Sequence, residues 1–206
     1  MKKNDLFEIN ITKIFDTNLI QILKIQKDYM QLYDMIMIGG CDSFNGKAKI
    51  LLSENVFKEQ FKSFHEKSGI ILLLHNAYPI YSTIYGVNQQ NGGFLKFINY
   101  RQMKIFKQVQ FNKDCGKDDI ISIPFNLFKN GQKTLDVSET HQAPIHDQNF
   151  MVFFNGDLSY QYYVENINEN IGNIELGHKV EITESEKYLI YNIICHLYNF
   201  RKEKIK

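Results

Sequence analysis

The sequence predicts an α+β protein, in which strands and helices follow one another without a regular strand–helix–strand alternation. Short apolar runs at residues 70–74 and 150–154 suit buried strands. Longer segments near both ends of the chain repeat apolar residues at helical spacing, with polar residues between them. The 206 residues, 44% of them hydrophobic, are enough for one packed domain with an extension.

The first 80 residues predict two helices and two strands. A helix is expected over residues 18–33, after the capping oxygens of Asp16, Thr17 and Asn18. A short strand over residues 34–38 follows, and a second helix begins after Ser53 and stops at residues 68–69. The apolar run over residues 70–74 is a buried strand. We interpret residues 1–80 as an N-terminal extension of mixed helix and strand.

The remaining chain predicts a domain over residues 81–200, followed by a basic tail over residues 201–206. Its first half is expected to contain a strand at 82–87, a roughly helical segment at 94–111 and a weak strand at 119–125. A turn-rich polar stretch at 126–147 follows. The second half is expected to contain a strand at 150–154, a helical segment at 158–171 and a last helix from 184 to about 201. Thr183 is placed to cap the last helix.

Charge and composition exclude several classes of partner. There are 24 basic and 23 acidic residues, a net charge of +1, which favours neither nucleic acid nor an anionic membrane. The apolar run at residues 70–74 is far shorter than the ~20 residues that cross a bilayer, and the first residues contain no apolar signal-peptide region. We therefore expect no direct membrane insertion.

The cysteines and histidines predict an intracellular protein without a metal or cofactor. The three cysteines are widely spaced and form no CxxC motif, which favours free thiols in a reducing compartment. The cytoplasm fits best, and the mitochondrion is an alternative. The six histidines lack the short spacings of common zinc motifs.

The stretch over residues 150–157, FMVFFNGD, resembles a strand that ends beside an active site. An apolar strand there leads directly into Asn155 and Gly156. The amide of Asn155 and the backbone N–H of Gly156 could together stabilise an oxyanion. The alternative is a hairpin turn, for which Asn-Gly is a strong signal.

Several short segments occur in an order that resembles the type 2 glutamine amidotransferase domain of the asparagine synthetase family. The matching segments are Ser82-Thr83-Ile84-Tyr85-Gly86-Val87, Cys115-Gly116-Lys117-Asp118-Asp119, Asp136-Val137-Ser138, His141-Gln142-Ala143-Pro144, Asn155-Gly156-Asp157, Gly177-His178 and Thr183-Glu184-Ser185-Glu186. The resemblance covers about 120 residues. It implies a four-layer αββα sandwich of the Ntn-hydrolase kind, in which two packed sheets are flanked by helices.

The resemblance also implies roles for individual residues. Ser82 stands at the position of the family's N-terminal nucleophilic cysteine, and Asn155 with Gly156 at its oxyanion hole. Asp157 and Glu184 stand at substrate-binding positions. However, serine replaces the cysteine, residues 1–81 precede it, and the carboxylate-binding arginine has no match. A serine without a neighbouring base is a poor nucleophile.

These departures favour a catalytically inactive glutaminase-like domain that is a structural or binding subunit of a larger protein assembly. The alternative is an active amidotransferase that is cut between Tyr81 and Ser82, so that Ser82 carries a free amine and attacks glutamine. A third interpretation is an unrelated α+β domain with accidental motif matches.

Overall fold

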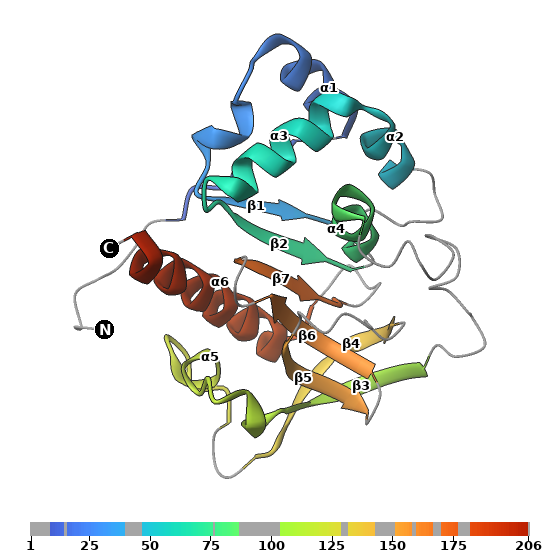
Figure 1. The fold of residues 1–206 in the computed structure, drawn as a ribbon. Coiled ribbons are helices and arrows are strands. Elements are labelled where there is room, and N and C mark those ends of the chain that lie inside the picture. The colour runs from blue at the N-terminus through green and yellow to red at the C-terminus, as the bar shows by residue number, and fades with distance from the viewer. Residues whose placement is uncertain are drawn as a thin grey trace.

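The computed structural model describes residues 9–14, 16–39, 47–75, 77–86, 104–128, 132–142, 151–157, 160–166, 170–176 and 182–205 (Figure 1). The strands in this part of the chain are β1 (Met35–Ile38), β2 (Ile70–Leu74), β3 (Lys104–Phe111), β4 (Thr134–Gln142), β5 (Met151–Asp157), β6 (Tyr160–Asn166) and β7 (Ile171–Ile174). The helices are α1 (Asp16–Ile25), α2 (Lys47–Ser53), α3 (Asn55–Glu66), α4 (Tyr78–Tyr85), α5 (Asp119–Ser122) and α6 (Glu184–Ile205), with 3-10 turns η1 (Tyr29–Leu32) and η4 (Lys113–Cys115).

All seven described strands lie in one mixed sheet, in the order β1-β2-β7-β6-β5-β3-β4. The strands β1, β2 and β7 are parallel to one another, and each remaining neighbour pair is antiparallel. The pairing of β2 with β7 joins segments that are about 100 residues apart, with Ile71 opposite Ile171 and Leu73 opposite Asn173. The sheet therefore has a short parallel part and a longer antiparallel part.

Helices cover both faces of this sheet, and each face has its own apolar core (Figure 1). On one face, residues of α1, α2, α3 and α4 pack on β1, β2, β6 and β7. On the other face, residues of α5 and α6 pack on strands from both parts of the sheet. The alternation of side chains along β2 shows this directly, because Ile71 and Leu73 face the first core whereas Ile70 and Leu72 face the second.

The structure confirms most of the elements predicted in the first 80 residues. The first predicted helix is α1 followed by η1, and the predicted strands are β1 and β2. In α3, Phe57, Phe61 and Phe64 recur at helical spacing and are almost fully buried. Between α3 and β2, the ring of Phe64 lies so close to Gly69 that a β-carbon there would come within 2.3 Å of it.

Several predictions after residue 80 were wrong. The expected strand at 82–87 overlaps helix α4 and the expected strand at 119–125 contains helix α5, whereas the turn-rich stretch at 126–147 contains strand β4. The helical segment expected at 158–171 contains β6, and residues 104–111 of the helix expected at 94–111 form β3. Residues 94–103 lie outside the described part of the chain.

Packing explains the largest of these errors. Ala77, Ile80, Tyr81 and Ile84 are buried on one side of α4 at helical spacing, with Pro79 in its first turn. In β6, Tyr162, Tyr163 and Val164 are buried in the two cores, and tyrosine and valine both favour strands. The residues of α4 thus carry a local helical signal, whereas in β6 the pairing with β5 and β7 outweighed a weak local pattern.

The general expectation of a mixed α and β fold agrees with the structure, but the arrangement of sheets differs. The expected sandwich has two packed sheets, whereas the described strands form one sheet with helices on each face. The boundary expected near residue 80 falls inside α4, and β2 from before it pairs with β7 from after it. The two predicted segments therefore share one sheet.

Candidate functional site at the carboxyl edge of the parallel strands

The carboxyl ends of β2 and β7 lie side by side at one edge of the sheet. In α/β proteins, ligands bind most often at the carboxyl ends of parallel strands. His75 follows the last residue of β2, and Glu175 follows the last residue of β7. The backbone N–H of His75 donates to the carbonyl of Ile174 at 2.9 Å, so the ladder between the two strands continues to this point.

Three polar side chains meet at this edge, and we name them the strand-end cluster: His75, Asn173 and Glu175. The Nδ1 atom of His75 lies 3.6 Å from Oε2 of Glu175, and their side chains are 15% and 3% exposed. The amide of Asn173 donates from Nδ2 to Oε1 of Glu175 at 3.0 Å. The cluster therefore combines an imidazole, a carboxylate and an amide in a largely dry environment.

Asn173 faces the core beneath α1 to α4. It lies two residues after Ile171, which belongs to that core, and alternate residues of a strand share a face. Asn173 is completely buried, and no hydrogen-bond partner for its Oδ1 atom is found among the residues that the structure describes. Buried amide oxygens are normally hydrogen-bonded, so this acceptor requires a physical explanation.

His75 occupies a sharp turn between a strand and a helix. Its φ angle is 22°, and α4 begins three residues later, at Tyr78. Hydrolases of the α/β class hold their nucleophile on a strand-to-helix turn of this kind, where the side chain is presented above the sheet edge. An imidazole at this turn can accept or donate a proton, and Glu175 can orient it.

The two cysteines in the described residues are not activated as nucleophiles. Burial raises the pKa of Cys115, and burial raises the pKa of Cys195 to about 11. Cys115 belongs to the core beneath α5 and α6, and Cys195 lies on α6. A raised pKa keeps each thiol protonated at neutral pH, and the protonated form is a weak nucleophile. Cys41 lies outside the described residues.

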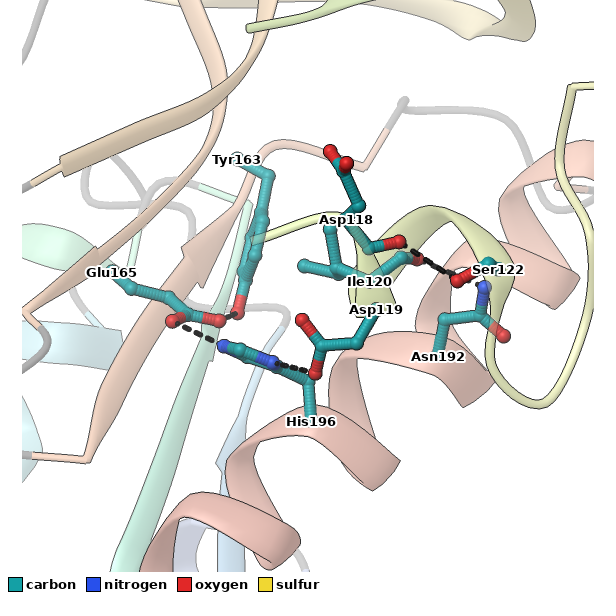
Figure 2. A network of polar contacts seen from close by, with 8 residues as sticks. All are labelled: Asp118, Asp119, Ile120, Ser122, Tyr163, Glu165, Asn192 and His196. Carbon is teal, nitrogen blue, oxygen red and sulfur yellow. Dashed lines mark hydrogen bonds and ion pairs between the residues drawn. The ribbon is translucent and has the colours of Figure 1, made fainter. Parts of the chain in front are cut away.

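A second polar cluster lies on the opposite face of the sheet (Figure 2). There, His196 of α6 is held between Asp119 of α5 and Glu165 of β6, with Nδ1 2.7 Å from Asp119 Oδ2 and Nε2 3.0 Å from Glu165 Oε2. The hydroxyl of Tyr163 donates to the other oxygen of Glu165. Asn192 also joins α6 to the α5 region, because its amide bonds to backbone groups of Ile120 and Phe125.

Opposing effects determine the charge of His196. Burial alone would lower its pKa, but hydrogen bonds and charge interactions with Asp119 and Glu165 outweigh burial and raise the pKa to about 9. The hydrogen bond from His196 lowers the pKa of Asp119 in turn. At neutral pH the cluster is therefore an imidazolium between two carboxylates. This arrangement links α5, α6 and β6, and we interpret it as structural.

Glu186 is the centre of a third buried group, at the start of α6. Its carboxylate accepts hydrogen bonds from the backbone N–H and hydroxyl of Ser138, from the hydroxyl of Tyr162 and from the backbone N–H of Thr183. The hydroxyl of Thr183 accepts from the backbone N–H of Glu186 in return. These reciprocal bonds form a capping box. The predicted cap at Thr183 is thus confirmed.

The site residues suggested by the sequence lie on separate elements. Ser82 is buried within α4, and Asn155, Gly156 and Asp157 are the last residues of β5. Asn155 pairs with Gln110 and Gln161 in an irregular part of the sheet. Helix α4, which holds Ser82, follows β2, and in the sheet β7 and β6 separate β2 from β5. Glu184 is exposed in the first turn of α6, where it forms an ion pair with Lys187. Their catalytic and binding roles remain predictions.

Neither the strand-end cluster nor His196 was predicted as a site from the sequence. A signal for the first was available, because His75 directly follows the clearest predicted strand. Its partners were hidden, because Asn173 and Glu175 fall between Gly172 and Gly177, where the sequence predicts a loop. Only the pairing of β2 with β7 brings them together.

Comparison with solved structures supports the fold alone. One similar structure, from Thermoplasma acidophilum, is described as a "putative gmp synthase subunit a protein", with a TM-score of 0.53, 12% identity, and coverage of 87% of this chain and 81% of that one. Another, from Bacteroides uniformis, is described as a "putative thua-like protein", with a TM-score of 0.55, 12% identity, and coverage of 85% and 74%. No family model and no curated protein matches the sequence. Among the described helices, none is long and apolar enough to cross a membrane.

Proposed function

We propose that this chain is a glutaminase-like module that does not hydrolyse glutamine and that serves as a structural or binding subunit of a larger assembly. The observation that carries the proposal is the strand-to-helix turn after β2, which holds His75 where an α/β hydrolase would hold its nucleophile. The name of one structural neighbour, a synthase subunit, supports a role within an assembly.

The sequence motifs that resemble asparagine synthetases support this proposal. A four-layer sandwich is not part of it, because the described strands lie in one sheet. Ser82 is 7% exposed, and its helical neighbours Tyr81 and Ile84 belong to the core. A serine buried in a helix, without a free α-amine, lacks the base that the N-terminal nucleophile of the resembled family uses.

The alternative of an active enzyme processed between Tyr81 and Ser82 is less well supported. Cleavage there would cut α4 between two buried residues and would separate Tyr81 from its ring contact with Tyr85, at 4.9 Å between centroids. A protease would first have to unfold this helix. We therefore favour the unprocessed chain, with free thiols at Cys115 and Cys195, in a reducing compartment such as the cytoplasm or the mitochondrion.

An ammonia-release assay on the purified full-length protein tests this function. We expect no release above buffer from glutamine, and an intact mass that includes residues 1–81. Release that is abolished by Ser82→Ala, together with a new N-terminus at Ser82, would instead establish the processed enzyme. Release that survives Ser82→Ala but is lost in Cys41→Ala would identify a thiol enzyme and would equally refute the proposal.

A further inference from the structure

The strand-end cluster has the spacing of a small cation site. His75 Nδ1 and Glu175 Oε2 are 3.6 Å apart, which is longer than a hydrogen bond. Two ligand atoms that each lie about 2.1 Å from a shared ion, and 3.6 Å from each other, subtend an angle of about 120° at that ion, within the range that a distorted tetrahedral site accepts. A direct ion pair between these side chains would normally bring the atoms nearer to 2.8 Å.

Asn173 offers a third candidate ligand oxygen beside Glu175. Its Nδ2 atom bonds to the Glu175 carboxylate, so its amide group is fixed beside that carboxylate. Its Oδ1 atom is fully buried, without a hydrogen-bond partner among the described residues. A buried acceptor next to a buried carboxylate requires a positive or hydrogen-donating group, and burial makes the lack of one costly.

We propose that His75, Glu175 and Asn173 bind a divalent transition-metal ion at the carboxyl edge of β2 and β7. An imidazole with oxygen ligands favours zinc or manganese over calcium and magnesium, which prefer oxygen alone. No group of three His, Cys, Asp or Glu side chains within the described residues is placed to hold a metal, so the amide of Asn173 is essential to the site. The ion would neutralise Glu175 and satisfy Asn173 Oδ1 together. The inference does not depend on whether the chain hydrolyses glutamine.

The first test is metal binding by the untagged full-length protein after removal of metals with a chelator. Zinc alone is titrated against the protein in a calorimeter, and cobalt is then bound in its place for visible spectroscopy. We expect one zinc ion per chain at this site and a cobalt spectrum that lacks thiolate charge-transfer bands. The proposal would be overturned if the protein failed to bind zinc in a stoichiometric amount. A cobalt spectrum that contains thiolate charge-transfer bands would overturn it as well.

Single substitutions then locate the bound ion. We expect His75→Gln and Glu175→Gln to weaken zinc binding at least tenfold. The matched control is His65→Gln, because His65 is a partly buried histidine that contacts the hydroxyl of Tyr85 instead, at 2.6 Å. Circular dichroism confirms that each variant is folded. Unchanged zinc affinity in folded His75→Gln and Glu175→Gln would place the ion elsewhere and refute the assignment.

A gain-of-affinity variant keeps the test decisive if those substitutions unfold the protein. Asn173→Asp adds a negative charge and a second oxygen at the proposed third ligand, so zinc should bind at least tenfold more tightly. If Asn173 only holds Glu175 in place, the added charge repels the neighbouring carboxylate and zinc affinity does not rise. That result would contradict the proposed site and would leave a buried water molecule as the partner of the amide.

Discussion

His196 shows how single buried residues set the properties of this protein. Its side chain is 6% exposed, and both of its ring nitrogens face carboxylates, from Asp119 on α5 and Glu165 on β6. The charged imidazolium therefore stabilises the contact between α6 and its neighbours, whereas a neutral imidazole would leave two carboxylates close together with less compensation. The protonation state of His196 thus affects how stably α5 and α6 pack on the sheet.

This arrangement predicts a specific dependence of stability on pH. Because the pKa of His196 is raised to about 9 in the folded protein, its contribution is fully present below the unfolded value near 6.5 and is lost as the pH rises through about 9. The loss amounts to about 3 kcal/mol at most. Urea unfolding between pH 6 and pH 10 should show this decline in the free energy of unfolding.

A substitution separates this effect from other titrating groups. The His196→Gln variant should be less stable than the natural protein at pH 6.5, and the difference between the two should shrink towards pH 10. His65→Gln serves as the matched control, because His65 lies on α3, on the other face of the sheet, and contacts the hydroxyl of Tyr85. A constant difference between the natural protein and His196→Gln across the pH range would show that folding does not raise the pKa of His196.

At the scale of elements, the start of α6 depends on one carboxylate. Glu186 is fully buried and joins the helix to Ser138 of β4 and Tyr162 of β6. Glu184, two residues earlier, is exposed and pairs only with Lys187 among the described residues. The two glutamates belong to the same four-residue motif, but their surroundings differ completely. The structural role in this motif therefore belongs to Glu186.

We predict that substitution of Glu186 strongly lowers the free energy of unfolding, whereas substitution of Glu184 hardly changes it. Glu186→Ala leaves the donors of Ser138, Tyr162 and Thr183 without their acceptor, and should lower the free energy of unfolding by about 3 kcal/mol or more. Glu184→Ala should change it by less than about 0.5 kcal/mol. Chemical denaturation measures both values. Comparable losses in the two variants would refute the assignment of the buried network to Glu186.

Elements with strong local signals could be predicted from the sequence, and elements determined by distant contacts could not. The phenylalanine spacing of α3 and the Thr183 cap of α6 are local, so both predictions agree with the structure. Helix α4 had a local signal as well, in Ala77, Ile80, Tyr81 and Ile84, but residues 82–87 were predicted as a strand. In β6, strand pairing outweighed a pattern that suited either structure.

At the scale of the whole molecule, the pairing of β2 with β7 holds the fold together. Ile70, Ile71, Leu72 and Leu73 are all completely buried, and they contribute to both cores. The same pairing creates the strand-end cluster, because it aligns His75 with Glu175. The sequence contains no local mark of this pairing between distant segments, and for that reason neither the single sheet nor the cluster could be predicted from it.

A fragment of residues 81–206 should therefore fail to fold independently. It lacks β2 and so exposes the edge of β7 and the apolar residues that β2 covers, Ile171 and Ile174 among them. Its far-ultraviolet circular dichroism and amide NMR spectrum should be those of an unfolded or aggregated chain. A cooperative thermal transition in this fragment would show that residues 81–206 form an autonomous domain.

Covalent labelling tests the absence of a glutaminase nucleophile most directly. The full-length protein is incubated with a chloroketone analogue of glutamine, and with a chloroketone of similar reactivity that lacks the amino-acid group, and its intact mass is then measured. Because Ser82 is buried in α4 and the thiols of Cys115 and Cys195 stay protonated, we expect no adduct that is specific to the glutamine analogue. Stoichiometric labelling by the glutamine analogue alone, mapped to one serine or cysteine, would contradict the proposed inactive module.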